Sequence, residues 1–387
     1  MPPATAHAAP FQVPPLQSHI TGSSTGAAPV QHPGAPVPRP FTPDYLGGYI
    51  SDRSSYEHGI YAEVNRLFPQ VRDTQPETMA ANMDITVRIN NTATPEQVSQ
   101  AQVDAIAAAG GLLTALSPAM GQRFGAEFRA ALGEGRLPKT SFLLDNGYLA
   151  RVGGLANSTL VEKRIFNYPR PHVVAPERIN RYNTPETGDL YLTSPAFPSG
   201  HTNQAVMTTT LLAYMVPELA PQLYYRGLEA GHSRVVLGVH YPLDVIGGRM
   251  SGYAAAADRL NDPKMRHAID QAATELRAEI EWRTGMPIAA LVASDIPYVP
   301  TAEVGEERVA AMMDYGLAPV YVTDAPMVVP QAAPVLLAAR FPEMTWEERE
   351  ALLRDTAAPA GNPLDWQGPG GSWQRINLAA AVVAPAR

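Results

Sequence analysis

The pattern of apolar and polar positions in the middle of the chain is predominantly helical. Stretches rich in alanine and leucine are separated by glycine and proline, and residues that favour helix starts precede several of them, as at Thr94 and Ser199. The pattern predicts helices over residues 95–115 (with a break near Gly110-Gly111), 121–133, 143–163, 199–215, 221–237, 242 to past 253, and 264–283.

Strand signals are few and short. They consist of β-branched pieces such as residues 84–89 and 320–323. We therefore expect an all-α protein whose body is a helical bundle.

The two ends of the chain differ from this body. Residues 1–44 are rich in proline, alanine and glycine and cannot bury enough apolar surface to offset their ordering entropy, so we expect an arm or tail with His7, His19 and His32 at its surface. Residues 285–387 are again rich in proline and alanine, with short helical pieces at 305–315 and 346–356. We predict a core over 45–284 and an irregular extension over 285–387 that packs on it or forms an oligomer contact.

Composition narrows the class of protein. Of 387 residues 45% are hydrophobic, 17% are charged and 38 are proline, so a sizeable core is possible and a coiled coil is excluded. The net charge of −8 disfavours binding to nucleic acid. The absence of cysteine excludes disulfides, thiolate metal sites and cysteine nucleophiles. No apolar run approaches the ~18–20 residues of a membrane span, and no signal peptide is visible.

Two clusters of residues suggest an anion site. Lys163 and Arg170 are seven positions apart, but the prolines on either side of Arg170 forbid a helix there, so the two cations would reach a common ligand from different directions. Ser199 and Gly200 precede an apolar helix, whose first N–H groups and small residues form a cradle for an anion, with His201 beside it. Each cluster alone is more often a surface pair or a capped helix.

A third cluster adds a nucleophile. Arg234 and His240 would lie about 120° apart on an unbroken helix, so they converge only if the helix ends between them, and Gly238 supplies the break. Pro242 then starts the next helix and places Asp244 in its first turn, where it can accept a hydrogen bond from His240. A carboxylate behind an imidazole fixes its tautomer and makes the other nitrogen a better nucleophile or base.

Together the three clusters resemble a known signature. Lys-x6-Arg-Pro at 163–171, Pro-Ser-Gly-His at 198–201 and Ser-Arg-x5-His-x3-Asp at 233–244 are similar to the motifs of the type 2 phosphatidic acid phosphatase (PAP2) superfamily. This superfamily includes bacterial class A non-specific acid phosphatases and vanadium haloperoxidases. The resemblance covers about residues 100–260 and implies the helical bundle of that superfamily.

The resemblance also implies roles for the motif residues. His240 would be the nucleophile that forms a phosphohistidine, Asp244 would orient it, and His201 would be the general acid and base. The phosphate would be held by five groups: Lys163, Arg170, Ser199, Gly200 and Arg234. No metal or other cofactor is expected, since the cations replace one.

Within the superfamily, the segments at 137–147 and 227–241 look closest to the class A acid phosphatases. We therefore expect hydrolysis of soluble, small-molecule phosphomonoesters, in the periplasm or after secretion by analogy with that group, with a homo-oligomer possible. The main alternative is a vanadium-dependent haloperoxidase, which would bind vanadate in the same cradle. A lipid phosphate phosphatase and an inactive binding scaffold are less favoured.

His172 and His232 adjoin the motifs and would either line the pocket or pack at its rim.

Overall fold

The fold is all-α, as the sequence predicts. The computed structural model describes residues 28–53, 61–107, 111–145, 150–154, 158–184, 194–300 and 307–384, and these ranges contain helices and turns but no strand. The α-helices along the chain are α2 (Phe68–Thr74), α3 (Pro76–Asn91), α4 (Pro95–Ala107), α5 (Leu112–Leu116), α6 (Gln122–Gly133), α7 (Pro138–Leu144), α9 (Leu160–Phe166), α10 (Pro171–Val174), α11 (Gly200–Met215), α12 (Ala220–Val236), α13 (Pro242–Asn261), α14 (Pro263–Thr284), α15 (Ile288–Ser294), α17 (Glu307–Asp314), α18 (Trp346–Asp355) and α19 (Leu378–Val383).

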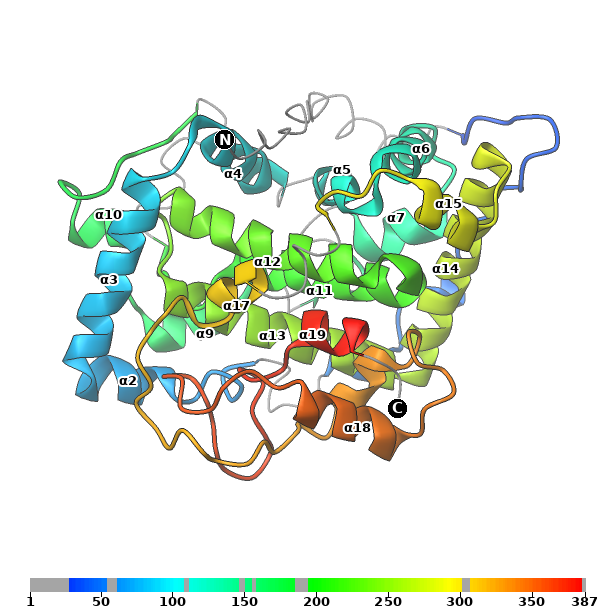
Figure 1. Cartoon of the computed structure of the whole chain (residues 1–387). Coiled ribbons are helices and arrows are strands. Elements are labelled where there is room, and N and C mark those ends of the chain that lie inside the picture. The colour runs from blue at the N-terminus through cyan, green and yellow to red at the C-terminus, as the bar shows by residue number, and fades with distance from the viewer. Residues whose placement is uncertain are drawn as a thin grey trace, which may run out of the picture.

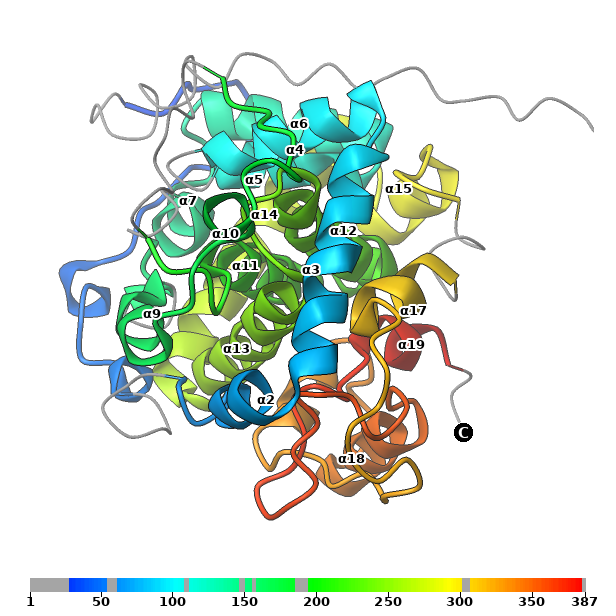
Figure 2. The ribbon, with the colours of Figure 1, turned by 90° about the vertical axis from the view of Figure 1, so that its left-hand side faces the viewer.

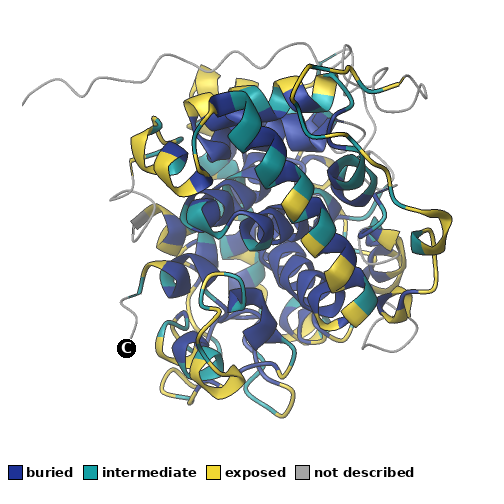
Figure 3. Cartoon of the chain, turned by 90° about the vertical axis from the view of Figure 1, so that its right-hand side faces the viewer, coloured by how far each residue is buried: buried dark blue, intermediate teal, exposed yellow. Residues whose placement is uncertain are grey.

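Three central helices, α11, α12 and α13, form the middle of the molecule. Figure 1 shows them between α3 on one side and α14 on the other, and Figure 3 shows that buried residues are concentrated in these inner helices. Glycines let the three helices approach closely: a Cβ added at Gly231 of α12 would lie 2.8 Å from Thr202 Cγ2 on α11, and one at Gly248 of α13 would lie 2.5 Å from the Ser199 carbonyl oxygen. Close packing therefore fixes the N-terminus of α11 against both neighbours.

Helix starts in this bundle follow local chemistry. Ser199 caps α11 by accepting a hydrogen bond from Thr202 N, and Thr94 and Gln97 form reciprocal hydrogen bonds at the start of α4. Pro242 occupies the first position of α13. These predicted starts are confirmed.

One predicted strand is wrong because its segment forms part of α3. Residues 84–89 lie in this helix, whose buried positions are polar and spaced four apart: Thr78, Asn82, Thr86 and Asn90. A helix with a polar inner face carries no apolar helical stripe, so the β-branched residues of this segment favoured a strand. The predicted strand at 320–323 is also wrong, since those residues form an irregular segment with one bend and the start of a turn.

The predicted continuous helix over 143–163 is wrong as well. Its described parts are the end of α7, a turn over 151–153, single helical residues at 154 and 158, and the start of α9. Residues 146–149 and 155–157 lie outside the described residues. Thr159 at the start of α9 has a φ of 48°, which an uninterrupted helix would not contain.

The C-terminal segment packs directly on the bundle. The buried guanidinium of Arg249 on α13 donates hydrogen bonds to the carbonyls of Ile376 (3.2 Å) and Met313 (3.1 Å), and apolar residues of α17 and α19 belong to the same hydrophobic core as α12. Figure 2 shows α17 and α19 beside the central helices, with α18 below them. Gly285, with a φ of 66°, ends α14 at the boundary that we predict. The division into a core over 45–284 and an extension over 285–387 stays a prediction.

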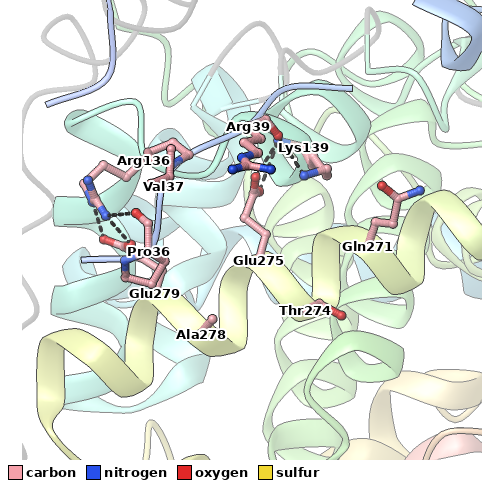
Figure 4. Close-up of a pocket in the computed structure, with 11 residues that line it drawn as sticks. Pro36, Val37, Arg39, Arg136, Lys139, Gln271, Thr274, Glu275, Ala278 and Glu279 are labelled. Carbon is pink, nitrogen blue, oxygen red and sulfur yellow. Dashed lines mark hydrogen bonds and ion pairs between the residues drawn. The ribbon is translucent and has the colours of Figure 1, made fainter. Parts of the chain in front are cut away.

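The described part of the N-terminal arm is anchored by hydrogen bonds. Arg136 donates to the carbonyls of Val30 (2.7 Å) and Pro36 (2.8 Å) while pairing with Glu279 on α14. A cavity of about 340 Å³ lies between the N-terminal arm and α14, and Figure 4 shows the residues that line it. His32 is half-exposed and contacts Glu134, whereas His7 and His19 lie outside the described residues.

None of the helices in the described ranges combines the length and the apolar character needed to cross a membrane.

Candidate active site

Lys163 reaches inward from α9. Its side chain is buried, and its ammonium donates hydrogen bonds to the carbonyls of Pro195 (2.7 Å) and Ala196 (2.8 Å). These contacts fix the segment that leads to the N-terminus of α11. An ammonium has three N–H groups, so one more remains for a ligand.

Arg170 lies where the sequence predicts an extended turn. It is the residue before α10, with φ −77° and ψ 154°. Its guanidinium donates to the carbonyls of Ser194 (2.7 Å) and Val239 (2.8 Å), and its Nη1 lies 3.1 Å from His240 Nε2. The backbone on both sides of the site thus fixes the direction of this cation.

His240 and Asp244 form a buried pair. His240 Nδ1 lies 2.9 Å from Asp244 Oδ2, which also accepts the backbone N–H of Tyr241 at 2.9 Å. Gly238, with a φ of 64°, turns the chain between α12 and α13 and makes this contact possible. With Nδ1 donating to the carboxylate, the lone pair of the neutral imidazole is on Nε2, which faces Arg170.

The N-terminus of α11 approaches the same pair. Ser199 N donates to the carbonyl of Asp244 at 2.9 Å, so the cap of α11 is tied to the first turn of α13. Gly200 is the first residue of α11 and is buried. His201 follows, and its Nε2 lies 3.2 Å from the carbonyl oxygen of Ala105 on α4.

Arg234 and His201 share the electrostatic environment of His240. Arg234 is fully buried in the last turn of α12. Burial lowers the pKa of His240 well below its ordinary value, and the charges of Arg170, Lys163 and Arg234 lower it further. Burial also lowers the pKa of His201, followed by the charge of Arg234. One electrostatic environment therefore contains all three cations and both imidazoles.

The pKa of Asp244, the acidic residue of the site, shifts in the opposite direction. Burial raises the pKa of Asp244 to about 7, partly offset by the hydrogen bond from Tyr241 N. Burial lowers the pKa of Lys163 well below its ordinary value, and the neighbouring Arg170 adds to the shift. Three basic side chains thus share this environment with Asp244, and a bound anion would relieve their repulsion and raise the pKa of both histidines.

Two further histidines near the motifs have different surroundings. His172 is buried, and its Nδ1 lies 3.3 Å from the carbonyl of Gly238, so it supports the turn that carries His240. His232 stacks on Tyr315 at 5.9 Å between ring centroids, and burial lowers its pKa to about 4. His232 therefore contacts the C-terminal segment.

The aromatic residues next to the motifs are structural. Phe166 and Phe197 are buried, and the ring of Phe197 stacks on Phe68 with 3.6 Å between centroids. Tyr168 packs against Tyr241 at 5.1 Å. This cluster backs the segments that hold Lys163 and Ser199.

Two asparagines that the motif analysis did not single out hold the His240 turn. Asn90 Nδ2 donates to the carbonyl of Val236 at 2.8 Å, and Asn82 Oδ1 accepts the N–H of Leu243 at 3.0 Å. Both lie on α3, so the end of α12 and the start of α13 are fastened to a third helix. The four-residue spacing of buried polar residues in α3 was the available signal.

Comparison with known proteins identifies the family. The family model described as the PAP2 superfamily matches residues 143–265, which include all three clusters. A non-specific acid phosphatase of Providencia stuartii is 30% identical over 180 residues, covering 46% of this chain and 67% of the relative. The chain belongs to the PAP2 superfamily. Non-specific acid phosphatases of Salmonella typhi and Salmonella typhimurium are each 31% identical over 139 residues, 36% of this chain.

The similarity to these superfamily members covers only part of each protein. The chain spans about half of the length of the two Salmonella relatives, 53% in each case. The family model includes neither the N-terminal arm nor the segment after residue 265.

Proposed function

We propose that this PAP2 superfamily member hydrolyses soluble phosphomonoesters through a phosphohistidine on His240. The observation that carries the proposal is the imidazole of His240, fixed by Asp244 at 2.9 Å, with its other nitrogen 3.1 Å from the guanidinium of Arg170. An anion bound at Arg170 would place its central atom next to that nitrogen.

In the first step, Nε2 of His240 attacks phosphorus and forms a P–N bond while the bond from phosphorus to the leaving oxygen breaks. His201 donates a proton to that oxygen, so the product leaves as an alcohol. Asp244 accepts the Nδ1–H of the ring and balances the positive charge that develops on it.

In the second step, His201 accepts a proton from water, the oxygen of which attacks phosphorus. The P–N bond breaks and its electrons return to His240, which restores the free enzyme and releases inorganic phosphate. Lys163, Arg170 and Arg234, with Ser199 and the N–H of Gly200, hold the non-bridging oxygens through both steps.

These roles need no cofactor, because three buried cations supply the charge that a divalent metal supplies in many phosphoryl-transfer enzymes. In the described ranges, no group of three or more acidic or histidine side chains is placed to hold a metal ion. The proposal rests on the cations rather than on this absence.

We also propose that the protein acts in the periplasm or after secretion.

The experiment compares two activities on the purified full chain. p-Nitrophenyl phosphate is assayed with and without a chelator, and bromide oxidation by peroxide is assayed with added vanadate. Phosphatase turnover that resists the chelator, together with an acid-labile phosphate on His240 seen by rapid quench and mass spectrometry, is expected. Peroxidase turnover without phosphatase turnover would instead establish the haloperoxidase alternative.

His240→Ala provides the second part of the test. It should abolish turnover and the labelled intermediate while the helical circular dichroism stays unchanged. Near-normal turnover in this variant would refute the assignment of the nucleophile.

A further inference from the structure

Asp104 on α4 has a dense set of hydrogen bonds that the proposed chemistry does not use. Its carboxylate is buried, with a side-chain exposure of 3%. It accepts hydrogen bonds from both terminal nitrogens of Arg226, from the hydroxyl of Ser233 at 2.8 Å and from the amide of Gln100 at 3.1 Å. Two carboxylate oxygens offer about four acceptor sites, so this carboxylate is saturated. Its bonds to Arg226 and Ser233 link α4 to α12, and these two helices lie side by side in Figure 1.

Both ends of this link adjoin the proposed active site. Ser233 directly precedes Arg234, one of the three cations. On the other side, Asp104 directly precedes Ala105, whose carbonyl oxygen lies 3.2 Å from His201 Nε2. The two helices that Asp104 joins therefore carry a phosphate-binding cation and the hydrogen-bond acceptor of an imidazole.

The carbonyl of Ala105 decides which nitrogen of His201 transfers the proton. A carbonyl only accepts, so Nε2 must carry the hydrogen. The lone pair of the neutral ring is then on Nδ1, and the proton that moves to and from the substrate is on Nδ1. Ala105 thus does for His201 what Asp244 does for His240, with a neutral acceptor in place of a charged one.

We propose that Asp104 is a positioning residue, which locks α4 to α12 so that the Ala105 carbonyl holds His201 in the Nε2–H tautomer, in which Nδ1 is the nitrogen that transfers the proton. This inference rests on the proposed function for its kinetic consequence, but the tautomer itself can be measured without turnover.

The kinetic test uses Asp104→Asn and two substrates with different leaving groups. p-Nitrophenolate leaves readily without a proton, whereas the alkoxide of β-glycerophosphate does not. General acid catalysis supplies typically ~10²–10⁴-fold in rate. We expect kcat/KM for β-glycerophosphate to fall at least ~10-fold more than kcat/KM for p-nitrophenyl phosphate. This ratio does not depend on the fraction of folded enzyme.

Glu279→Gln is the matched control. Figure 4 shows the buried bidentate pair of Glu279 and Arg136, whose side-chain exposures are 2% and 0%. The Asp104–Arg226 pair is equally buried, with exposures of 3% and 0%. The control variant should lose thermal stability but keep the wild-type ratio of the two kcat/KM values. An equal loss for both substrates in Asp104→Asn would show that Asp104 is merely structural and would overturn the proposal.

Two further measurements keep the inference falsifiable if Asp104→Asn fails to fold. Ser233→Ala keeps the Arg226 pair and removes one hydrogen bond, and it should shift the ratio in the same direction by ~3-fold; an unchanged ratio counts against the proposal. Long-range ¹H–¹⁵N spectra of the wild-type protein with labelled histidine should assign His201 as the Nε2–H tautomer, and an Nδ1–H tautomer would overturn it. If the wild type hydrolyses neither substrate, the proposed function fails, while the tautomer measurement still decides the inference.

Discussion

The substitution Asp244→Asn tests the central pair of the site. Asp244 Oδ2 accepts hydrogen bonds from His240 Nδ1 and from Tyr241 N, both at 2.9 Å, and its side chain is fully buried. Asparagine has nearly the same shape and keeps one acceptor oxygen. It removes the negative charge while changing the packing little.

The expected loss follows from the charge that develops on the imidazole. When Nε2 bonds to phosphorus, the ring keeps its Nδ1–H and becomes positive, opposite a carboxylate whose charge centre is ~4 Å away. At an effective dielectric constant of ~20, that pair interacts by ~4 kcal/mol. A hydrogen bond to a charged group contributes ~1.5–3 kcal/mol by a separate estimate. Since ~1.36 kcal/mol is tenfold in rate, these estimates predict that kcat falls by ~10–10³.

The assay is steady-state hydrolysis of p-nitrophenyl phosphate with rapid-quench measurement of the phosphoenzyme, carried out above pH 7 so that Asp244 is ionised in the wild type. Formation of the phosphoenzyme should slow with kcat, because the lost interaction belongs to the charged intermediate and to the transition state that leads to it. A kcat within ~3-fold of wild type would refute the reasoning, since the carboxylate would then contribute less than one ordinary hydrogen bond.

The same substitution should change the dependence of stability on pH. Burial raises the pKa of Asp244 from 3.8 to about 7, so its contribution to the free energy of unfolding is present below pH 3.8 and is lost as the pH rises to about 7. Asparagine does not ionise. The thermal midpoint of the variant relative to wild type should therefore rise over this interval, and a difference that stays constant would contradict a carboxyl group whose pKa burial raises.

Three more predictions concern the cradle and its support. Arg170→Lys should weaken competitive inhibition by phosphate ~10–100-fold, because a lysine cannot reproduce the fixed fork that donates to Ser194, Val239 and a ligand together; an unchanged inhibition constant would place the anion elsewhere. Phosphate at ~100 times its dissociation constant should stabilise the fold by ~2.7 kcal/mol and raise the pKa of His201 in an NMR titration, because the dianion offsets the cations that lower it; a pKa that does not move would contradict a shared site. Asn90→Ala should lower the free energy of unfolding by ~1–3 kcal/mol in chemical denaturation and should reduce kcat. The control Asn91→Ala, at the exposed neighbouring residue, should do neither, and equal effects of the two variants would show that Asn90 does not hold the His240 turn.

The sequence by itself determined the parts of this protein that depend on neighbouring residues. Helix starts at Ser199 and Pro242, the extended backbone at Arg170 and the break at Gly238 follow from chemistry within a few positions, and the structure has them where the pattern predicts them. The spacing from His240 to Asp244 is likewise local, since the carboxylate lies one helical turn from the ring that it contacts.

Only the tertiary structure decided the contacts between distant segments. Asp104 meets Ser233 across 129 positions and Asn90 meets Val236 across 146, and no periodicity in either segment encodes the partner. The same reason explains the wrong strand at 84–89, because a helix with a polar buried face is stable only against the particular donors and acceptors of the helices that it covers. Burial, and with it the direction of each pKa shift in the site, arises when the whole bundle excludes water, so it belongs to the fold and not to any one motif.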